Sequence, residues 1–346
     1  MAPIEWPVAA GSDDRAASST RRVDRDRLST VRADFFLDPK ARLTEQERAL
    51  MTAMLADLVA TVADEIRVAA QLRSEAASDH RASLVERLAA SRLLDIPELI
   101  ALLLCRAEQE RVSTTIRPRG KGGPASFLHT LAAHPDADVA AAAMAVILGR
   151  SRRRDRFDAP RIDLDDVPAE AAVRFVYAVT AAIRASEAAS GADRRLADAA
   201  AARLGRHDET KRIDALTFAL VHALEHAGSL DEDTIRSALA DGELGIFAEA
   251  LSRRAGVDAE TAWNGVAAGG PELACLLRMA QLPRQVAAEI AAAMGEAALG
   301  GPAELIGLFD SLSDDDVERA RDWMQLDRQY REAITALGRP DGDPAN

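Results

Sequence analysis

Residues 44–62 read TEQERALMTAMLADLVATV, and this stretch decides the fold class. Its first four residues form a capping box, in which the Thr44 hydroxyl and the Glu47 carboxylate satisfy backbone N–H groups at the start of a helix. The apolar residues that follow recur at helical spacing and predict one buried stripe: Leu50, Met51, Met54, Leu55, Leu58 and Val62. We expect a second helix to begin at Asp64, because an acidic side chain favours the positive end of the helix dipole.

Helix signals of the same kind recur along the rest of the chain. Prolines that suit the first position of a helix are Pro97, Pro124, Pro168, Pro271, Pro283 and Pro302. Capping boxes are also predicted at Ser229 and Ser313. Glycines that suit helix ends are Gly228, Gly256 and Gly300. No alternating apolar–polar run rich in β-branched residues occurs, so the sequence predicts an all-α protein without a sheet.

Short connections between helices predict antiparallel pairs, stacked as a HEAT-like solenoid or as two helical subdomains. Residues 1–30 and 338–346 lack apolar periodicity and are expected to be disordered tails. Between them we expect an N-terminal helical-repeat domain over 31–155 and a C-terminal helical domain over 168–337. The stretch 156–167, which is rich in Asp and Pro, is interpreted as the linker between them.

Composition restricts the function classes. The chain has 346 residues with 43 Lys and Arg against 56 Asp and Glu, which gives a formal net charge of −13. Such a balance disfavours general binding to nucleic acid, whose phosphates would be repelled. Two cysteines and the absence of a secretory-type N-terminus or an apolar run of membrane-spanning length favour a cytoplasmic protein.

Short motifs resemble a known bacterial family. They include Phe35-Phe36-Leu37, Asp64-Glu65-Ile66-Arg67 and Ser91-Arg92-Leu93-Leu94-Asp95, with a later run from Phe247 to Leu251 and another from Phe309 to Trp323. Together these resemble domain-of-unknown-function family 2336 over about residues 33–337. The segments at 64–72 and 138–143 also resemble the second helix of a HEAT-type repeat. The resemblance implies an all-helical, repeat-like fold and supplies no activity.

One motif could carry catalysis. His222-Ala223-Leu224-Glu225-His226 matches H-x-x-E-H, the inverted zinc-protease signature. Two histidines four residues apart share one helix face and could hold a metal ion, with Glu225 as general base. Glu243 and Glu249 are possible third ligands by their order in the chain. The alternative interpretation is a helix end before Gly228, where histidine suits the negative end of the dipole.

A basic run follows an alanine-rich segment. It contains five arginines: Arg150, Arg152, Arg153, Arg154 and Arg156. Exposed arginines here could bind an acidic partner, an anionic lipid surface or nucleic acid. Replacing exposed charges typically costs below about 1 kcal/mol each. The alternative is a solvated helix C-terminus, where cations offset the dipole, although five arginines exceed what capping needs.

Other candidates are weaker. The Gly-rich basic segment from Ile116 to Pro124 lacks the spacing of a phosphate-binding loop and is interpreted as a linker. Cys105 and Cys275 lie in apolar surroundings typical of core residues. The aromatic residues Trp263, Trp323 and Tyr330 are expected to be packing anchors. No dinucleotide or Cys-x-x-Cys pattern occurs, so no cofactor is predicted.

These observations favour a non-enzymatic helical scaffold that mediates protein–protein interaction, with the arginine run as its partner-binding surface. A metal-dependent hydrolase built on His222, Glu225 and His226 is the first alternative. A nucleic-acid-binding helical array is the second, and it would need a basic concave face.

Overall fold

The computed structural model describes residues 43–72, 78–116, 126–186, 191–295 and 301–338. Within these ranges it contains sixteen α-helices, two short 3₁₀-helices and no strand, which confirms the predicted all-α class. One compact unit spans Glu45–Arg331, and a second joins Met1–Thr44 with Glu332–Asn346. Of the second unit, only residues 43–44 and the end of the last helix, α17 (Arg328–Gly338), are described. The predicted tails, 1–30 and all but the first residue of 338–346, therefore lie outside the described residues.

Two hydrophobic cores hold the Glu45–Arg331 unit together. The first core is built by α2 (Glu45–Ala69), α3 (Ser78–Ala90), the start of α4 (Pro97–Ile116), η2 (Leu164–Asp166), α7 (Ala169–Ser186) and α8 (Asp193–Leu204). At its centre Leu58, Ile66 and Phe175 are fully buried. Burying an apolar side chain of this size typically contributes about 1.5–3 kcal/mol.

The second core is larger, and the short 3₁₀-helix η3 (Glu209–Lys211) lies in the chain between its first two helices and the others. Its helices are α5 (Phe127–Ala132), α6 (Ala137–Ser151), α9 (Ile213–His226), α10 (Glu232–Ala240), α11 (Leu244–Ala255), α12 (Ala259–Ala268), α13 (Gly270–Met279), α14 (Arg284–Met294), α15 (Pro302–Ser311) and α16 (Asp314–Gln325). Phe247 and Leu251 of α11 are buried at its centre.

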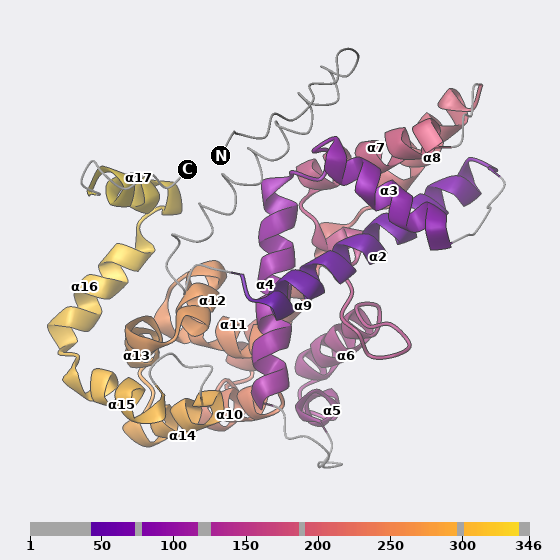
Figure 1. Cartoon of the computed structure of the whole chain (residues 1–346). Coiled ribbons are helices and arrows are strands. Elements are labelled where there is room, and N and C mark those ends of the chain that lie inside the picture. The colour runs from indigo at the N-terminus through magenta and orange to yellow at the C-terminus, as the bar shows by residue number, and fades with distance from the viewer. Residues whose placement is uncertain (1–42, 73–77, 117–125, 187–190, 296–300, 339–346) are drawn as a thin grey trace, which may run out of the picture. The chain divides into compact units, whose positions relative to one another are not determined.

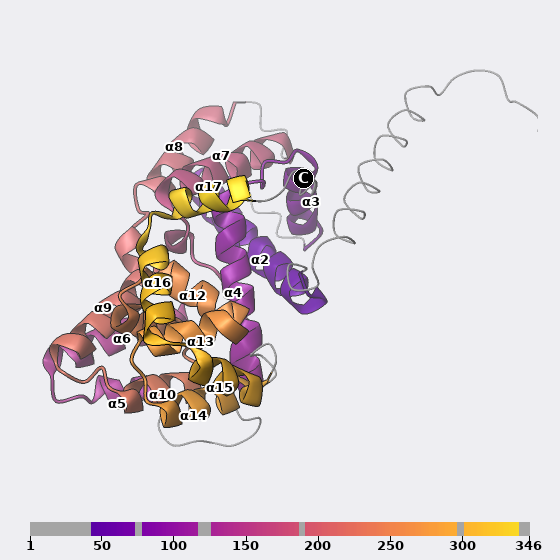
Figure 2. The same cartoon turned by 90° about the vertical axis from the view of Figure 1, so that its left-hand side faces the viewer.

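Helix α4 belongs to both cores. Leu99, Leu103 and Ala107 pack into the first core, and Val112 packs into the second. Figures 1 and 2 show the same arrangement: α3, α7 and α8 gather at one end of α4, while α10, α14 and α15 lie at the other. The two cores therefore interleave along the chain and do not meet at the predicted linker, 156–167.

The predicted linker is itself packed. Ile162, Leu164 and Val167 are buried in the first core, although α5 and α6, which precede them in the chain, belong to the second. One of the aspartates that suggested a break instead caps η2, because the Asp163 side chain accepts a hydrogen bond from the Asp165 backbone N–H.

The predicted solenoid is not confirmed. In a regular solenoid each repeat contacts only its neighbours. Here α2 packs against α7 and α8 as well as against α4, and α6 packs against α9. The close approach of α6 to α9 is visible at Gly149, where an added Cβ would lie 2.6 Å from the Leu216 Cδ1 atom.

Two helix starts differ from the prediction. Helix α2 runs without a break through Asp64, which pairs with Arg67 at 3.4 Å; an acidic residue favours a helix start but does not force one. Helix α10 is capped by Asp231, whose carboxylate accepts from the Thr234 N–H, and not by Ser229. The capping box at Ser313 is confirmed.

The aromatic anchors and cysteines are only partly as expected. Trp263 is buried and donates from Nε1 to the Glu108 carboxylate at 3.3 Å. Trp323 and Tyr330, however, are exposed. Cys275 is buried and Cys105 is half-buried, in keeping with their expected place in the core.

Candidate partner-binding site

The predicted arginine run lies where α6 ends. The helix stops at Ser151, and the following residues 152–161, here called the arginine loop, turn back on themselves. The Asp155 N–H donates to the Ala159 carbonyl at 3.0 Å, and the Arg161 N–H donates to the Arg153 carbonyl at 2.9 Å. These two main-chain bonds close the base of the loop.

The tip of the arginine loop is pinned by one side chain. The Asp155 carboxylate accepts hydrogen bonds from the backbone N–H groups of Phe157 at 2.7 Å and Ala159 at 2.9 Å. These backbone donors lower the pKa of Asp155, so the carboxylate stays charged and keeps both bonds near neutral pH. Asp158 takes a positive φ of 65°, which Asp tolerates better than most residues. The loop is therefore a defined turn.

Three arginines of the run point inward and are paired. Arg150 binds the Glu243 carboxylate, and Arg154 binds both oxygens of Glu110, at 3.0 and 2.6 Å. Burial by itself lowers the pKa of Arg154, but the hydrogen bond and charge of Glu110 raise it overall, so the guanidinium stays charged.

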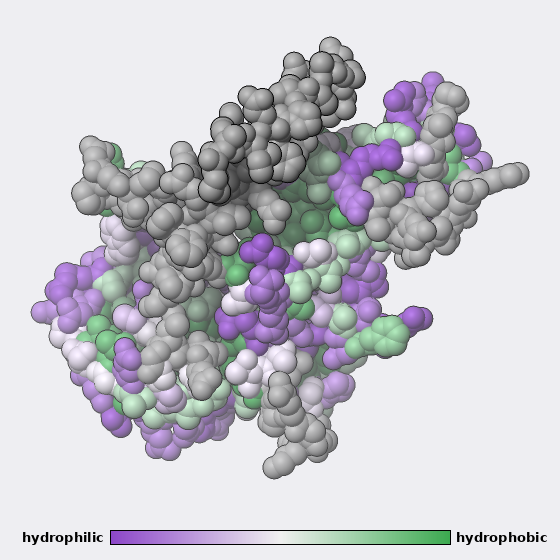
Figure 3. Space-filling view, in the orientation of Figure 1, coloured by the Kyte–Doolittle hydropathy of each residue, from purple (hydrophilic) through white to green (hydrophobic). Residues whose placement is uncertain are grey.

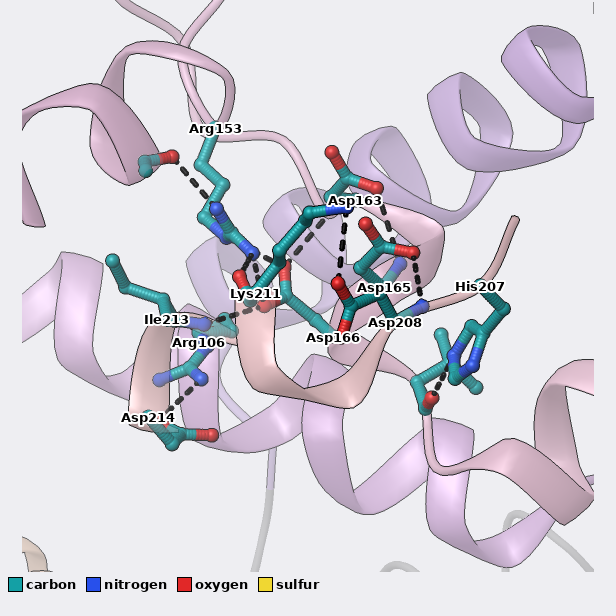
Figure 4. Close-up of polar contacts among 12 residues, drawn as sticks. Arg106, Arg153, Asp163, Asp165, Asp166, His207, Asp208, Lys211, Ile213 and Asp214 are labelled. Carbon is teal, nitrogen blue, oxygen red and sulfur yellow. Dashed lines mark hydrogen bonds and ion pairs between the residues drawn. The ribbon is translucent and has the colours of Figure 1, made fainter. Parts of the chain in front are cut away.

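The third inward arginine, Arg153, makes the most buried pair. Its Nε and Nη2 atoms donate to the two oxygens of Asp166 at 2.7 and 2.6 Å, and Asp166 is only 1% exposed. Asp166 also accepts from the backbone N–H groups of Asp163 at 3.1 Å and Ile213 at 2.9 Å. Figure 4 shows Arg153 directed at this carboxylate, which ties α6, η2 and the start of α9 together.

Two further contacts fix the neighbouring segments (Figure 4). The Asp165 carboxylate accepts from the Asp208 N–H at 3.1 Å, and the His207 Nε2 atom lies 2.9 Å from the Val167 carbonyl. Asp163, Asp165 and Asp166 therefore act as structural acceptors, and the stretch predicted to be a linker is held in place by them.

A cavity of about 140 Å³ lies beside the inward arginines. Charged residues lining it are Arg106, Glu110, Arg150, Arg153, Arg154, Arg161, Asp214 and Glu243. Each of the five arginines has its own acidic partner. Arg106 pairs with Asp214 at 2.6 Å, and Arg161 pairs with Asp57 at 2.7 Å. The basic charge of the cavity is thus balanced by the protein's own carboxylates.

The remaining two arginines face outward. Arg152 is exposed and has no acidic partner within the described ranges. The Arg156 guanidinium lies 4.6 Å from the centre of the Phe157 ring, a cation–π contact. Phe157 is 75% exposed. Figure 3 shows hydrophobic surface beside hydrophilic surface where the chain projects after α6.

The structure therefore divides the predicted run into two groups. The expectation that all five arginines are exposed is wrong for Arg150, Arg153 and Arg154, because their acidic partners are distant in sequence. A partner-binding role remains a prediction for Arg152 and Arg156. Phe157 was missed; its only sequence signal is a large aromatic residue inside a stretch rich in Asp, Arg and Pro.

The H-x-x-E-H motif forms the exposed face at the end of α9. His222 and His226 lie side by side, with ring centres 4.1 Å apart. The Glu225 carboxylate, predicted to be a general base, is bound by Arg253 of α11. The third-ligand candidates do not complete a site: Glu243 pairs with Arg150, and Glu249 is buried in α11. Among the described residues, no three His, Cys, Asp or Glu side chains are grouped so that they could hold a metal ion.

The Gly-rich basic candidate falls outside what can be described, because residues 117–125 are not among the described ranges. In the part of the chain that the structure does describe, every helix is too short or too polar to cross a membrane.

The protein is all-helical, and its two hydrophobic cores interleave along the chain. A family model described as an uncharacterised protein conserved in bacteria, DUF2336, matches residues 109–322. The match spans more than half of the chain, so the protein belongs to this family, as its motifs suggested. Neither the curated proteins nor the solved structures contain a significant match.

Proposed function

We propose that the protein is a non-catalytic helical scaffold that binds an acidic segment of a partner protein through Arg152, Arg156 and Phe157. The observation that carries the proposal is Phe157, which is held 75% exposed at the tip of the arginine loop. We further propose that it acts in the cytoplasm, in keeping with two cysteines that form no disulfide.

The energetics of the loop support a binding role. Leaving a phenylalanine exposed forgoes about 1.5–3 kcal/mol that its burial would contribute. The turn that exposes the ring is closed by backbone bonds and by Asp155, so little conformational entropy would be lost when a partner binds. Aromatic residues and arginine are enriched among residues that dominate binding energy.

Charge supports an acidic partner. Arg152 and Arg156 lack acidic partners in the described ranges, whereas the chain as a whole carries a formal net charge of −13. Two unpaired cations beside an apolar ring would attract and orient an acidic segment. A nucleic-acid function is not proposed, because the arginines that would face phosphates are paired with Glu110, Asp166 and Glu243.

The proposal can be tested by crosslinking in the bacterium that makes the protein. Phe157 is replaced by a photo-reactive phenylalanine analogue, and the crosslinked protein is identified. Its binding to the purified full-length chain is then measured at low and high salt. We expect Phe157→Ser to weaken binding by about 30-fold, the effect of about 2 kcal/mol that is typical of a dominant contact. Arg152→Gln with Arg156→Gln should slow association and reduce its salt dependence.

A matched control exists on α9. Phe218 is also an exposed phenylalanine, 48% exposed, and it also has an arginine over its ring, with Arg253 at 5.9 Å. The same photo-reactive analogue at position 218 should not capture this partner, and Phe218→Ser should leave its binding unchanged. If positions 157 and 218 capture the same proteins, or if Phe157→Ser binds like the unaltered chain, the proposal is wrong.

A further inference from the structure

The exposed face of α9 carries a ladder of rings that the proposed function does not use. Phe218, His222 and His226 follow one another at intervals of four residues and are all exposed. The Phe218 and His222 rings are stacked with centres 5.9 Å apart, and the His222 and His226 centres are 4.1 Å apart. The two imidazoles are therefore neighbours at the surface of a regular helix.

One imidazole is already held in the orientation of a metal ligand. The Nδ1 atom of His226 lies 2.9 Å from the His222 carbonyl oxygen. A carbonyl only accepts hydrogen bonds, so Nδ1 must carry the proton in this contact. In the neutral ring, the Nε2 atom then carries a lone pair that can bind a metal ion. Metal-binding histidines commonly donate their second ring N–H to a carbonyl in this way.

Nothing within the motif competes for the second imidazole. His222 has the Phe218 ring on one side and His226 on the other. The motif's carboxylate, Glu225, is bound to Arg253, with Nε at 3.1 Å and with Nη2 as well. A cation placed at the two rings would therefore meet two nitrogen ligands and no carboxylate from this motif.

We propose that His222 and His226 together hold one divalent transition-metal ion, with water in its remaining coordination positions. Imidazole nitrogen suits Cu²⁺, Ni²⁺ and Zn²⁺, and among divalent ions of this series Cu²⁺ binds nitrogen ligands most tightly. Magnesium and calcium, which prefer oxygen ligands, are not held. The site differs from the hydrolase expected from the sequence, because Glu225 takes no part in it.

The proposal is tested by titrating the full-length protein with Cu²⁺ in a non-chelating buffer and measuring heat and electron paramagnetic resonance spectra. We expect one tight equivalent with two nitrogen ligands. His222→Asn and His226→Asn should each weaken it by at least about tenfold, since each removes one arm of the chelate. Mg²⁺ should produce no binding heat.

Two control variants separate this site from other sources of binding. His129→Asn removes a histidine of α5 that is hydrogen-bonded to Ser126, and it should leave the Cu²⁺ affinity within about twofold. Glu225→Gln should also leave it unchanged. Full affinity in both His222→Asn and His226→Asn overturns the proposal. If Glu225→Gln loses as much Cu²⁺ affinity as the histidine variants, the proposal that the two histidines are the only ligands from the motif is wrong, and the carboxylate is a ligand as well.

Discussion

Replacing Arg153 with Gln should destabilise the protein far more than the same change at Arg152. Arg153 and Asp166 have side chains only 10% and 2% exposed, and Arg153 supplies two of the four hydrogen bonds to the carboxylate. Removing one member of a buried pair typically costs about 3–5 kcal/mol, because the other charge is left without its partner. Asp166 keeps the backbone donors of Asp163 and Ile213, so we expect the lower end of this range, about 3 kcal/mol.

Arg152→Gln is the matched control within the same run. Arg152 is exposed and unpaired in the described ranges, so the change should cost below about 0.5 kcal/mol. Stability is measured by urea unfolding, followed by circular dichroism at the helix band. At about 2 °C per kcal/mol for a unit of this size, the melting temperature of Arg153→Gln should fall by about 6 °C.

A double-mutant cycle isolates the pair itself. Asp166→Asn should be destabilising alone, and the Arg153→Gln and Asp166→Asn changes together should cost at least about 1 kcal/mol less than their sum. Equal unfolding midpoints for Arg153→Gln and Arg152→Gln would refute the reasoning. So would additive effects of the two changes at the pair, because both results would mean that the buried contact contributes nothing.

Two further predictions concern groups whose pKa is raised. Burial raises the pKa of Glu249, with Arg253 opposing and Asp214 adding to the shift. The residue is 7% exposed, and its carboxyl makes no hydrogen bond or ion pair with another described residue. Because the pKa of Glu249 is higher in the folded protein, the stability that the protonated carboxyl contributes is fully present below about pH 4.5 and is lost as the pH rises through the folded pKa. Glu249→Gln should therefore raise the urea unfolding midpoint at pH 7 but not at pH 4. Equal shifts of the midpoint at both pH values would contradict this. Burial also raises the pKa of Cys105 to about 11, against the opposing charge of Arg106, so about one thiol in a thousand is ionised at pH 8. In a Cys275→Ser variant, the remaining thiol should therefore react with a disulfide reagent at pH 8 much more slowly in the folded protein than in urea, and equal rates in the two states would contradict the raised pKa.

Local sequence signals predicted where helices form but not which helices pack against one another. The cap at Ser313 and the proline at the start of α4 depend on residues within one turn, so the sequence is sufficient to locate them. Asp64 shows the limit of such signals, since an acid that could open a helix also fits inside α2 when Arg67 lies three residues on. Which helices pack together depends on contacts such as α2 with α8, for which no local pattern exists.

The candidate site shows the same limit at the level of side chains. Five arginines within seven residues look like one basic surface, yet the chain turns sharply at 152–161, so that three of them point inward and two, Arg152 and Arg156, point outward. The acidic partners lie far along the chain: Glu110 is 44 residues before Arg154, and Glu243 is 93 residues after Arg150. The direction of each arginine is set by tertiary contacts. Charge and spacing in the sequence therefore located the arginine run but could not tell the inward arginines from the exposed ones.

The division of the run explains why Phe157 stays exposed. An apolar ring on a flexible loop would fold back onto the protein and gain the free energy of burial. Both ends of the arginine loop are held by ion pairs, through Arg154 to Glu110 of α4 at the start and through Arg161 to Asp57 of α2 at the end. Asp155 fixes the turn between them, so the Phe157 ring cannot fold back and pack against the rest of the protein without breaking buried or charge-assisted bonds. Under the proposed function, the inward arginines therefore fix the position of the arginine loop, and Arg152, Arg156 and Phe157 stay exposed and bind the partner.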